Sequence, residues 1–325
     1  PYVMRRLYGW LLSSFVGLGF AAYFVPSHSD APQGTLELKP RAIVKHKPID
    51  EMSGIARSST YEGVYWVHND SGDRPRIFPI RLDGSVIIPP FVSRRDASDR
   101  AEDPSIVYEG ILIEGAANID WEDIATDGDM IYIADVGNNS NARRDLAVYA
   151  VKEPNPEVTI QAHVLKRIPV AYPDQKAFPG DVWHFDCEAV FMFQGKLYFL
   201  TKHRAPRQLA TPENGTKLYR LDTQHLDRVN VLTLVDSHSD LGGWVTAAAM
   251  SPNGRVLAVL CQAPQQSIWL FERPARGDKF LSEGKARRIP IRNGKQCEAI
   301  EWIDNKQFVV TNEQRELFIV DTNAR

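Results

Sequence analysis

Seven polar side chains recur at corresponding places in a repeated pattern, and they could bind a cation or exchange protons. They are Asp70, Glu122, Asp135, Glu188 and Glu298, with Lys202 and Asn312 at matching points. Carboxylate and amide oxygens suit Ca²⁺, which takes six to eight oxygen ligands. Two of the carboxylates could instead act as general acid and base, or each could be solvated or paired with Lys202. All of these chemistries require the chain to bring the side chains together.

The elements that would position them form a repeat. Each copy has a short apolar strand, a polar or glycine-containing turn, and a second strand rich in Val, Ile, Leu and aromatic residues. The copies occupy residues 52–70, 121–137, 187–203, 245–262 and 297–313. A third strand follows every copy and a fourth follows four of them. The last copy ends at Arg325 without a fourth strand, and residues 35–46 hold one strand that belongs to no copy.

This arrangement predicts an all-β fold, a five-bladed β-propeller over residues 35–325, with one four-stranded antiparallel blade per copy. The N-terminal strand would complete the last blade, close the ring and remove its exposed edge. A six-bladed ring is the alternative if the insertion at 86–113 holds a degenerate blade. A two-sheet sandwich does not predict five copies of one pattern.

In a propeller, the entrances to the first strands and the exits from the second strands lie at the same rim. The entrances carry Glu122, Glu188 and Glu298, and the exits carry Asp70, Asp135, Lys202 and Asn312. We therefore expect one acidic mouth, with a Ca²⁺ site on Asp70, Glu122, Asp135, Glu188 and Glu298 as one interpretation of it.

The N-terminus predicts a membrane anchor. Residues 7–25 carry no charge, and a helix of this length spans about 28 Å, close to the roughly 30 Å of a bilayer core. Arg5 and Arg6 precede the span, so residues 1–6 should stay in the cytoplasm. Residues 26–34 would form a linker to a periplasmic propeller, which makes this a single-pass protein of the inner (cytoplasmic) membrane. The alternative is a cleaved signal peptide.

The predicted span has one face of small residues. Gly9, Ser13, Gly17 and Ala21 are four residues apart and would form a ridge that lets a partner helix approach closely. The alternative is that membrane helices are simply rich in small residues.

Several functional classes are disfavoured. The net charge of −3 gives no reason to expect nucleic acid as a partner. The sequence contains no G-x-S-x-G elbow, P-loop or H-E-x-x-H motif, and no catalytic residue is assigned. Cys187 and Cys297 occupy equivalent positions in their copies, which indicates a packing role.

The stretches MSGIARSS, DWEDIA and CEAVFMFQGKLYFLTK resemble a family of exported bacterial β-propeller proteins. More distantly, the pattern is similar to calcium-dependent propeller enzymes such as phytases and lactonases. With its anchor, the chain resembles the accessory subunits of gemmatimonad-type photosynthetic reaction-centre–light-harvesting complexes.

That resemblance implies a non-catalytic structural subunit whose propeller caps the periplasmic face of a multisubunit membrane complex. Its partners would be membrane-protein subunits, contacted through the span and the propeller, and the lipid bilayer. No cofactor would be required, although Ca²⁺ could bind. The alternatives are a calcium-dependent hydrolase and a periplasmic module that binds a ligand or a protein.

Overall fold

The computed structural model describes residues 34–92 and 108–323. The chain divides into two compact units, Pro1–Gln33 and Gly34–Arg325, and the predicted span, with its ridge Gly9, Ser13, Gly17 and Ala21, lies outside the described residues. Within the described part, no helix is long and apolar enough to cross a membrane.

The described unit is almost entirely antiparallel β-structure, built from groups of four strands. The first group is β3 (Met52–Arg57), β4 (Tyr65–Asn69), β5 (Arg76–Ile80) and β6 (Ile111–Glu114). The second is β7 (Trp121–Asp127), β8 (Met130–Asp135), β9 (Ala147–Lys152) and β10 (Gln161–Ala171). Parallel pairing of β6 with β10 joins these two groups into one sheet.

The remaining groups form separate sheets. The third is β11 (Trp183–Phe193), β12 (Lys196–Arg204), β13 (Thr216–Arg220) and β15 (Thr233–His238), while β14 (Asn230–Val231) pairs with β10. The fourth is β16 (Gly243–Met250), β17 (Val256–Pro264), β18 (Ser267–Glu272) and β19 (Ala286–Arg292), with a short helix α2 (Phe280–Glu283) before β19. The last is β20 (Cys297–Trp302), β21 (Gln307–Asn312), β22 (Glu316–Asp321) and β2 (Ala42–Ile43).

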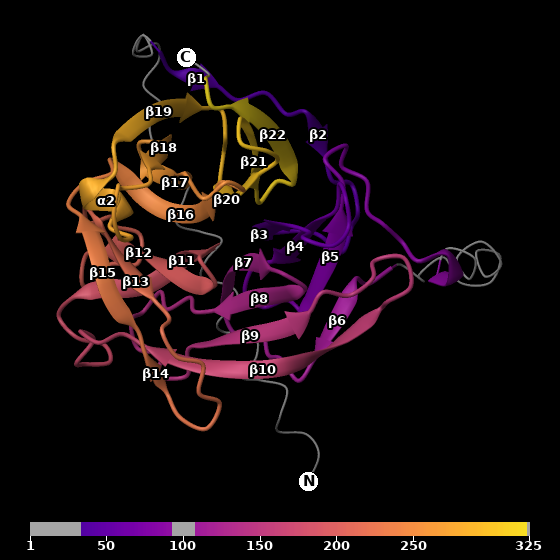
Figure 1. Ribbon diagram of the computed structural model, residues 1–325, viewed down its shortest axis with the longest axis horizontal. Coiled ribbons are helices and arrows are strands. Elements are labelled where there is room, and N and C mark those ends of the chain that lie inside the picture. The colour runs from indigo at the N-terminus through magenta and orange to yellow at the C-terminus, as the bar shows by residue number, and fades with distance from the viewer. Residues whose placement is uncertain (1–33, 93–107, 324–325) are drawn as a thin grey trace. The chain divides into compact units, whose positions relative to one another are not determined.

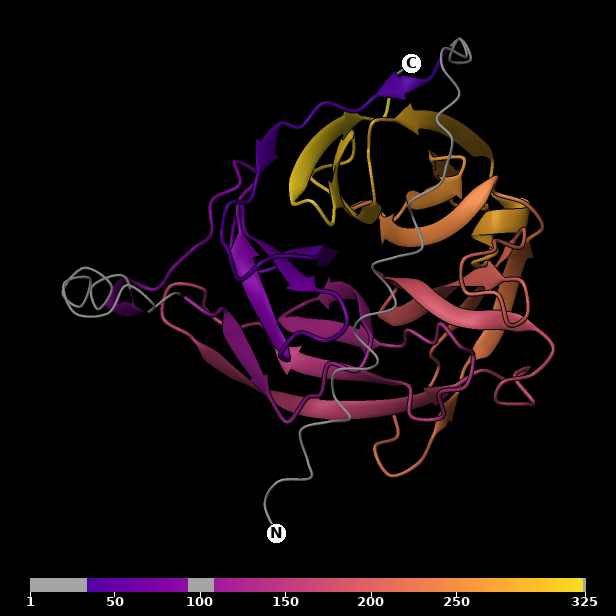
Figure 2. The same ribbon diagram turned by 180° about the vertical axis from the view of Figure 1, so that it is seen from behind.

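The first strands of the groups lie innermost and form a ring. Each of β3, β7, β11 and β16 contacts the innermost strand of the next group, and β20 contacts β3. Figures 1 and 2 show these strands around the centre, with β10, β15 and β2 at the outside. A ring of four-stranded antiparallel groups, packed face to face, is a β-propeller.

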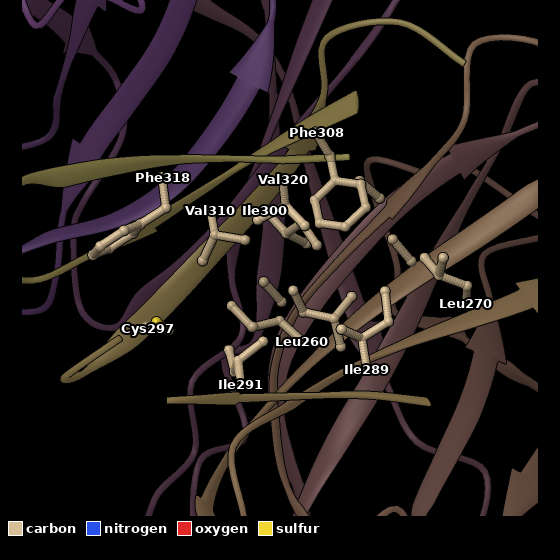
Figure 3. Packing of buried hydrophobic residues seen from close by; sticks show 14 of the residues in the cluster. Leu260, Leu270, Ile289, Ile291, Cys297, Ile300, Phe308, Val310, Phe318 and Val320 are labelled. Atoms are coloured by element: carbon tan, nitrogen blue, oxygen red, sulfur yellow. The ribbon is translucent and has the colours of Figure 1, made fainter. Parts of the chain in front are cut away.

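The hydrophobic core is divided among the junctions between neighbouring groups. Figure 3 shows one junction, where Leu260 and Ile289 of the fourth group pack with Phe308 and Phe318 of the last. Successive side chains of a strand point to opposite faces. In β21, Phe308 therefore faces the fourth group, while its neighbour Val309 packs on the first. Strands covered on both faces read as continuous apolar runs, as the repeats do.

Two further core residues confirm a prediction from the sequence. Cys187 and Cys297 are fully buried in two such junctions, and both are free thiols. They have the packing role that their equivalent positions indicated.

The N-terminal segment differs from the single strand expected over residues 35–46. It forms two separate two-residue strands: β1 (Leu36–Glu37) pairs parallel with β19, and β2 pairs antiparallel with β22. Pro40 lies between them, and because proline has no N–H to donate, it interrupts a strand. The segment therefore crosses from the outer edge of the fourth group to that of the last.

Replacing Val44 with alanine should lower the free energy of unfolding by about 1–2.5 kcal/mol, since it removes fully buried methyl groups. Val44 is 0% exposed in the junction between the last and first groups. The adjacent Ile43 is 46% exposed, so Ile43→Ala is the matched control and should cost little. Urea unfolding of both variants measures the difference. Equal effects would show that the segment does not seal this junction.

Candidate binding site at the mouth of the ring

The candidate site is built on an irregularity of strand pairing that recurs in every innermost strand. Near its start, each of these strands has a point where two of its residues lie opposite one residue of the partner strand, which is a β-bulge. The extra residues fall between Met52 and Ile55, Trp121 and Asp123, Cys187 and Ala189, Val245 and Ala247, and Cys297 and Ala299. Bulges re-aim side chains and are common beside functional sites.

The side chains at these bulges are of two kinds. Three are the glutamates that the sequence singled out, Glu122, Glu188 and Glu298. The other two are hydroxyls that tie the ring together: Ser53 donates to the carbonyl of Glu122 at 3.1 Å, and Thr246 donates to that of Cys297 at 2.9 Å. Three of the bulges thus present a glutamate side chain, and the other two present a hydroxyl that is hydrogen-bonded to the next group of strands.

Acidic side chains from several groups of strands converge around these glutamates. Carboxylate oxygens of Asp70, Asp120 and Glu122 lie within 4.8 Å of one another, as do those of Glu122, Asp186 and Glu188. Glu298 and Glu313 interact electrostatically with the same group. We call the acidic mouth the set Asp70, Asp120, Glu122, Asp186, Glu188, Glu298 and Glu313, with the cations Lys202 and Arg204.

The two cations neutralise one side of the acidic mouth. Lys202 donates to Glu188 at 2.7 Å, and Arg204 contacts Asp186 at 2.8 Å. Both cations lie over the ring of Trp244, 5.0 and 4.8 Å from its centroid. Burial alone would raise the pKa of Asp186, but Arg204 and Lys202 outweigh it and lower that pKa. Asp186 therefore favours its ionised form, in which it pairs with Arg204.

The other carboxylates hold their protons more tightly than usual. Burial raises the pKa of Glu298 to about 8 and that of Glu188 to about 7, in both cases against the opposing charge of Lys202. Burial, with Asp186 and Asp70 nearby, raises the pKa of Asp120 to about 7. Carboxyl groups with pKa values near neutrality can exchange protons under physiological conditions, so the acidic mouth can either bind a cation or perform acid–base chemistry.

The structure brings together most of the acidic residues expected from the sequence. Asp70, Glu122 and Glu188 lie in the two carboxylate groups. Glu298 lies beside them, where Gln262 donates to its carboxylate at 3.0 Å, but it belongs to neither group.

The structure places Asp135 and Asn312 outside this set of converging carboxylates. Asp135 pairs with Arg143 at 3.0 Å and accepts the backbone N–H of Asp120. Asn312 donates to the carbonyl of Gly294 and to Glu316. The reason is register, because both residues sit opposite the residue that precedes a bulge glutamate. Side chains alternate along a strand, so it is the following position that faces the mouth; Asp70, Lys202 and Glu313 occupy that position.

Sequence reasoning missed Asp120, Asp186, Glu313 and Arg204. A signal for two of them was present, since Asp120-Trp121-Glu122 and Asp186-Cys187-Glu188 share the pattern of an acid two residues before the glutamate. Residues two apart on a strand share a face, and this pattern could have identified both aspartates.

A second feature lies at the other end of the innermost strands. A cavity of about 330 Å³ is lined there by residues that include Arg57, Met192, Met250, Glu301 and Trp302. Burial raises the pKa of Glu301 to about 7, although its carboxylate accepts the backbone N–H of Arg57 at 3.1 Å. This cavity is polar and separate from the acidic mouth.

No protein-family model matches the sequence, and no curated protein does. Solved structures that are similar, at low identity, include the following two. The Neurospora crassa Pan2 WD40 domain is 8% identical, with a TM-score of 0.36, and the match covers 86% of this chain and 65% of that one. A glucose dehydrogenase is 10% identical, with a TM-score of 0.45, and the match covers 87% and 99%. The assignment as a propeller rests on the strand order of the chain itself.

Proposed function

We propose that this protein is an exported accessory subunit that acts by binding, and that the acidic mouth is its functional end. The observation that carries the proposal is the charge imbalance there: the carboxylates outnumber Lys202 and Arg204, and several of them are buried. Buried carboxylates that lack partners are costly, so a fold that retains them at one rim has a use for them.

We also propose that the ring has five blades, with β2 as the outermost strand of the last. The cyclic contacts among β3, β7, β11, β16 and β20 support this number. The outer position of β2 beside β22 supports closure by the N-terminal segment.

In this proposal an N-terminal anchor holds the binding module at the membrane. The uncharged residues 7–25, preceded by Arg5 and Arg6, would hold the propeller on the periplasmic face of the inner membrane. There it would cap a multisubunit complex, which by resemblance is a photosynthetic reaction-centre–light-harvesting complex. The ridge Gly9, Ser13, Gly17 and Ala21 would pack against a helix of that complex.

Purification from native membranes in mild detergent tests the accessory role. The chain should co-purify with other membrane subunits, and Gly17→Leu should weaken that association because a large side chain separates the helices. Leu18→Phe lies off the ridge and is the control. A chain that purifies alone, free of other subunits, would refute the accessory role.

The raised pKa values favour a second candidate, a hydrolase that uses the acidic mouth. Glu298 and Glu188, with pKa values of about 8 and 7, could serve as acid and base. Hydrolysis of p-nitrophenyl phosphate and of a δ-lactone, with and without CaCl₂, tests this candidate. Turnover that is abolished in Glu298→Gln would establish the hydrolase. If neither probe is turned over, the hydrolase is refuted and the binding subunit is the remaining candidate.

A further inference from the structure

Three carboxylates of the acidic mouth come together at one side of it and have no cation partner in the part of the chain that the structure describes. Asp70 follows β4, Asp120 precedes β7, and Glu122 lies at the bulge of β7, and their oxygens lie within 4.8 Å of one another. Among the described residues, no lysine, arginine or histidine is within ion-pair distance of any of the three. Glu188 and Asp186, in contrast, have Lys202 and Arg204.

Glu122 is the buried member of this trio. Its side chain is inside the protein, with 7% of the residue exposed, and no described residue donates a hydrogen bond to its carboxylate. It also belongs to both groups of converging carboxylates, so it points into the centre of the acidic mouth. An ionised carboxylate buried without donors is costly, and it must be accompanied by a proton or by a cation from outside the chain.

The backbone around the trio is shaped to fit closely against these carboxylates. A Cβ at Gly137 would lie 2.1 Å from Oε1 of Glu122 and 2.4 Å from Oδ2 of Asp120, so a larger residue there would displace these carboxylates. The N–H of Gly137 donates to the carbonyl of Asp120 at 3.1 Å, and Asp135 accepts the N–H of Asp120 at 3.0 Å. Asp135 and Gly137 therefore act as positioning residues that hold Asp120 and Glu122 in place.

We propose that Asp70, Asp120 and Glu122 hold a divalent cation, and that this cation is Ca²⁺. The inference rests on the proposed function, in which the acidic mouth is the binding end, and it names the ligand. All three side chains offer oxygen and none offers nitrogen or sulfur, which suits a hard cation and not Zn²⁺. Asp70 and Asp120 are partly exposed, so water can supply the remaining ligands of a Ca²⁺ ion.

The competing explanation is that protons alone neutralise the trio. Thermal unfolding of the full-length protein in detergent, first in EGTA and then in 1 mM CaCl₂, separates the two. A bound cation stabilises the folded state by mass action, and the midpoint should rise by about 3–6 °C, given a protein of this size. Neutralisation by protons predicts no shift.

The decisive variant is Glu122→Gln, which removes the charge and keeps the volume. In EGTA it should be at least as stable as the wild type, because the unpartnered carboxylate is gone, and it should lose the calcium shift. Asp120→Asn should lose the shift as well. Asp127→Asn, at the exposed far end of the same strand β7, should keep it.

No calcium shift in the wild type, or an equal shift in Glu122→Gln, would overturn the site. Co-purification with the membrane complex is scored separately on the same preparations. If the wild type shows no calcium shift but still co-purifies with the membrane complex, the cation site is refuted and the accessory role stands. A calcium shift in a chain that purifies alone supports the cation and refutes the accessory role.

Discussion

Replacing Arg204 with methionine should lower the free energy of unfolding at pH 7 by about 3–5 kcal/mol, because removing one partner of a buried ion pair leaves an uncompensated charge. Arg204 is 4% exposed and Asp186 is 0% exposed. The guanidinium makes bonds of 3.1 and 2.8 Å to one oxygen of Asp186, contacts Asn139, and stacks over Trp244. Methionine keeps the apolar contact with Trp244 and removes every donor.

Two comparisons make this result specific. Arg207→Met removes an exposed arginine whose nearest acid, Asp181, is 3.8 Å away and also exposed, and such pairs contribute little. Adding Asp186→Asn to Arg204→Met should recover part of the loss, since the stranded charge disappears. Denaturant unfolding gives all the values. If Arg204→Met and Arg207→Met differed by less than about 1 kcal/mol, the ion pair would not be the source of stability.

The propeller could be predicted because its signal is repeated and coarse. Runs such as residues 52–57 and 65–69 are buried on both faces, since each group of strands is covered by a neighbour on either side. Such a signal survives an error of one residue. The shorter β1 and β2 carry no periodicity of their own, and their partners are decided by the path of the chain around Pro40.

The site could be predicted only in part, because an error of one residue in the strand register changes which side chains face the acidic mouth. When the first two copies of the repeat are aligned by their acidic residues, Asp70 is paired with Asp135. In the structure Asp135 corresponds to Asn69, since each sits opposite the residue that precedes the bulge. A shift of one position moves a side chain to the other face. The bulges that aim the glutamates insert one residue without any apolar signature, so no hydrophobic pattern reveals them.

Distant partners were beyond the sequence for a different reason. Arg204 and Asp186 are 18 residues apart, and Asp70 and Asp120 come from different groups of strands. The first pair meets through the register of the β11–β12 hairpin, and the second meets because neighbouring groups of strands pack together in the ring. Sequence periodicity constrains the faces of strands but not these contacts.

Raising the pH from 5 to 8 should destabilise the folded protein in EGTA, and Glu298→Gln should remove part of that loss. Burial raises the pKa of Glu298 from 4.5 to about 8 in the folded state, while in the unfolded chain it should be near 4.3. The folded state therefore binds the proton more tightly. Its stabilising effect is complete below the unfolded pKa and is lost as the pH rises through the folded pKa.

The direction of the effect follows from burial, which is the main cause of the raised pKa of Glu298. The charge of Lys202 works against it, and the charges of Glu188, Glu313 and Asp70 add to it. At about 1.4 kcal/mol per pKa unit, and allowing for partial exposure, Glu298→Gln should be about 2–4 kcal/mol more stable than the wild type at pH 8. The two proteins should be nearly equal at pH 4.5, which is close to the unfolded pKa and well below the folded one. Glu283→Gln, at an exposed position on α2, should parallel the wild type throughout. Urea unfolding at pH 4.5, 6 and 8 measures the three profiles, and a Glu298→Gln profile parallel to the wild type would show that this carboxyl group ionises freely in the folded protein.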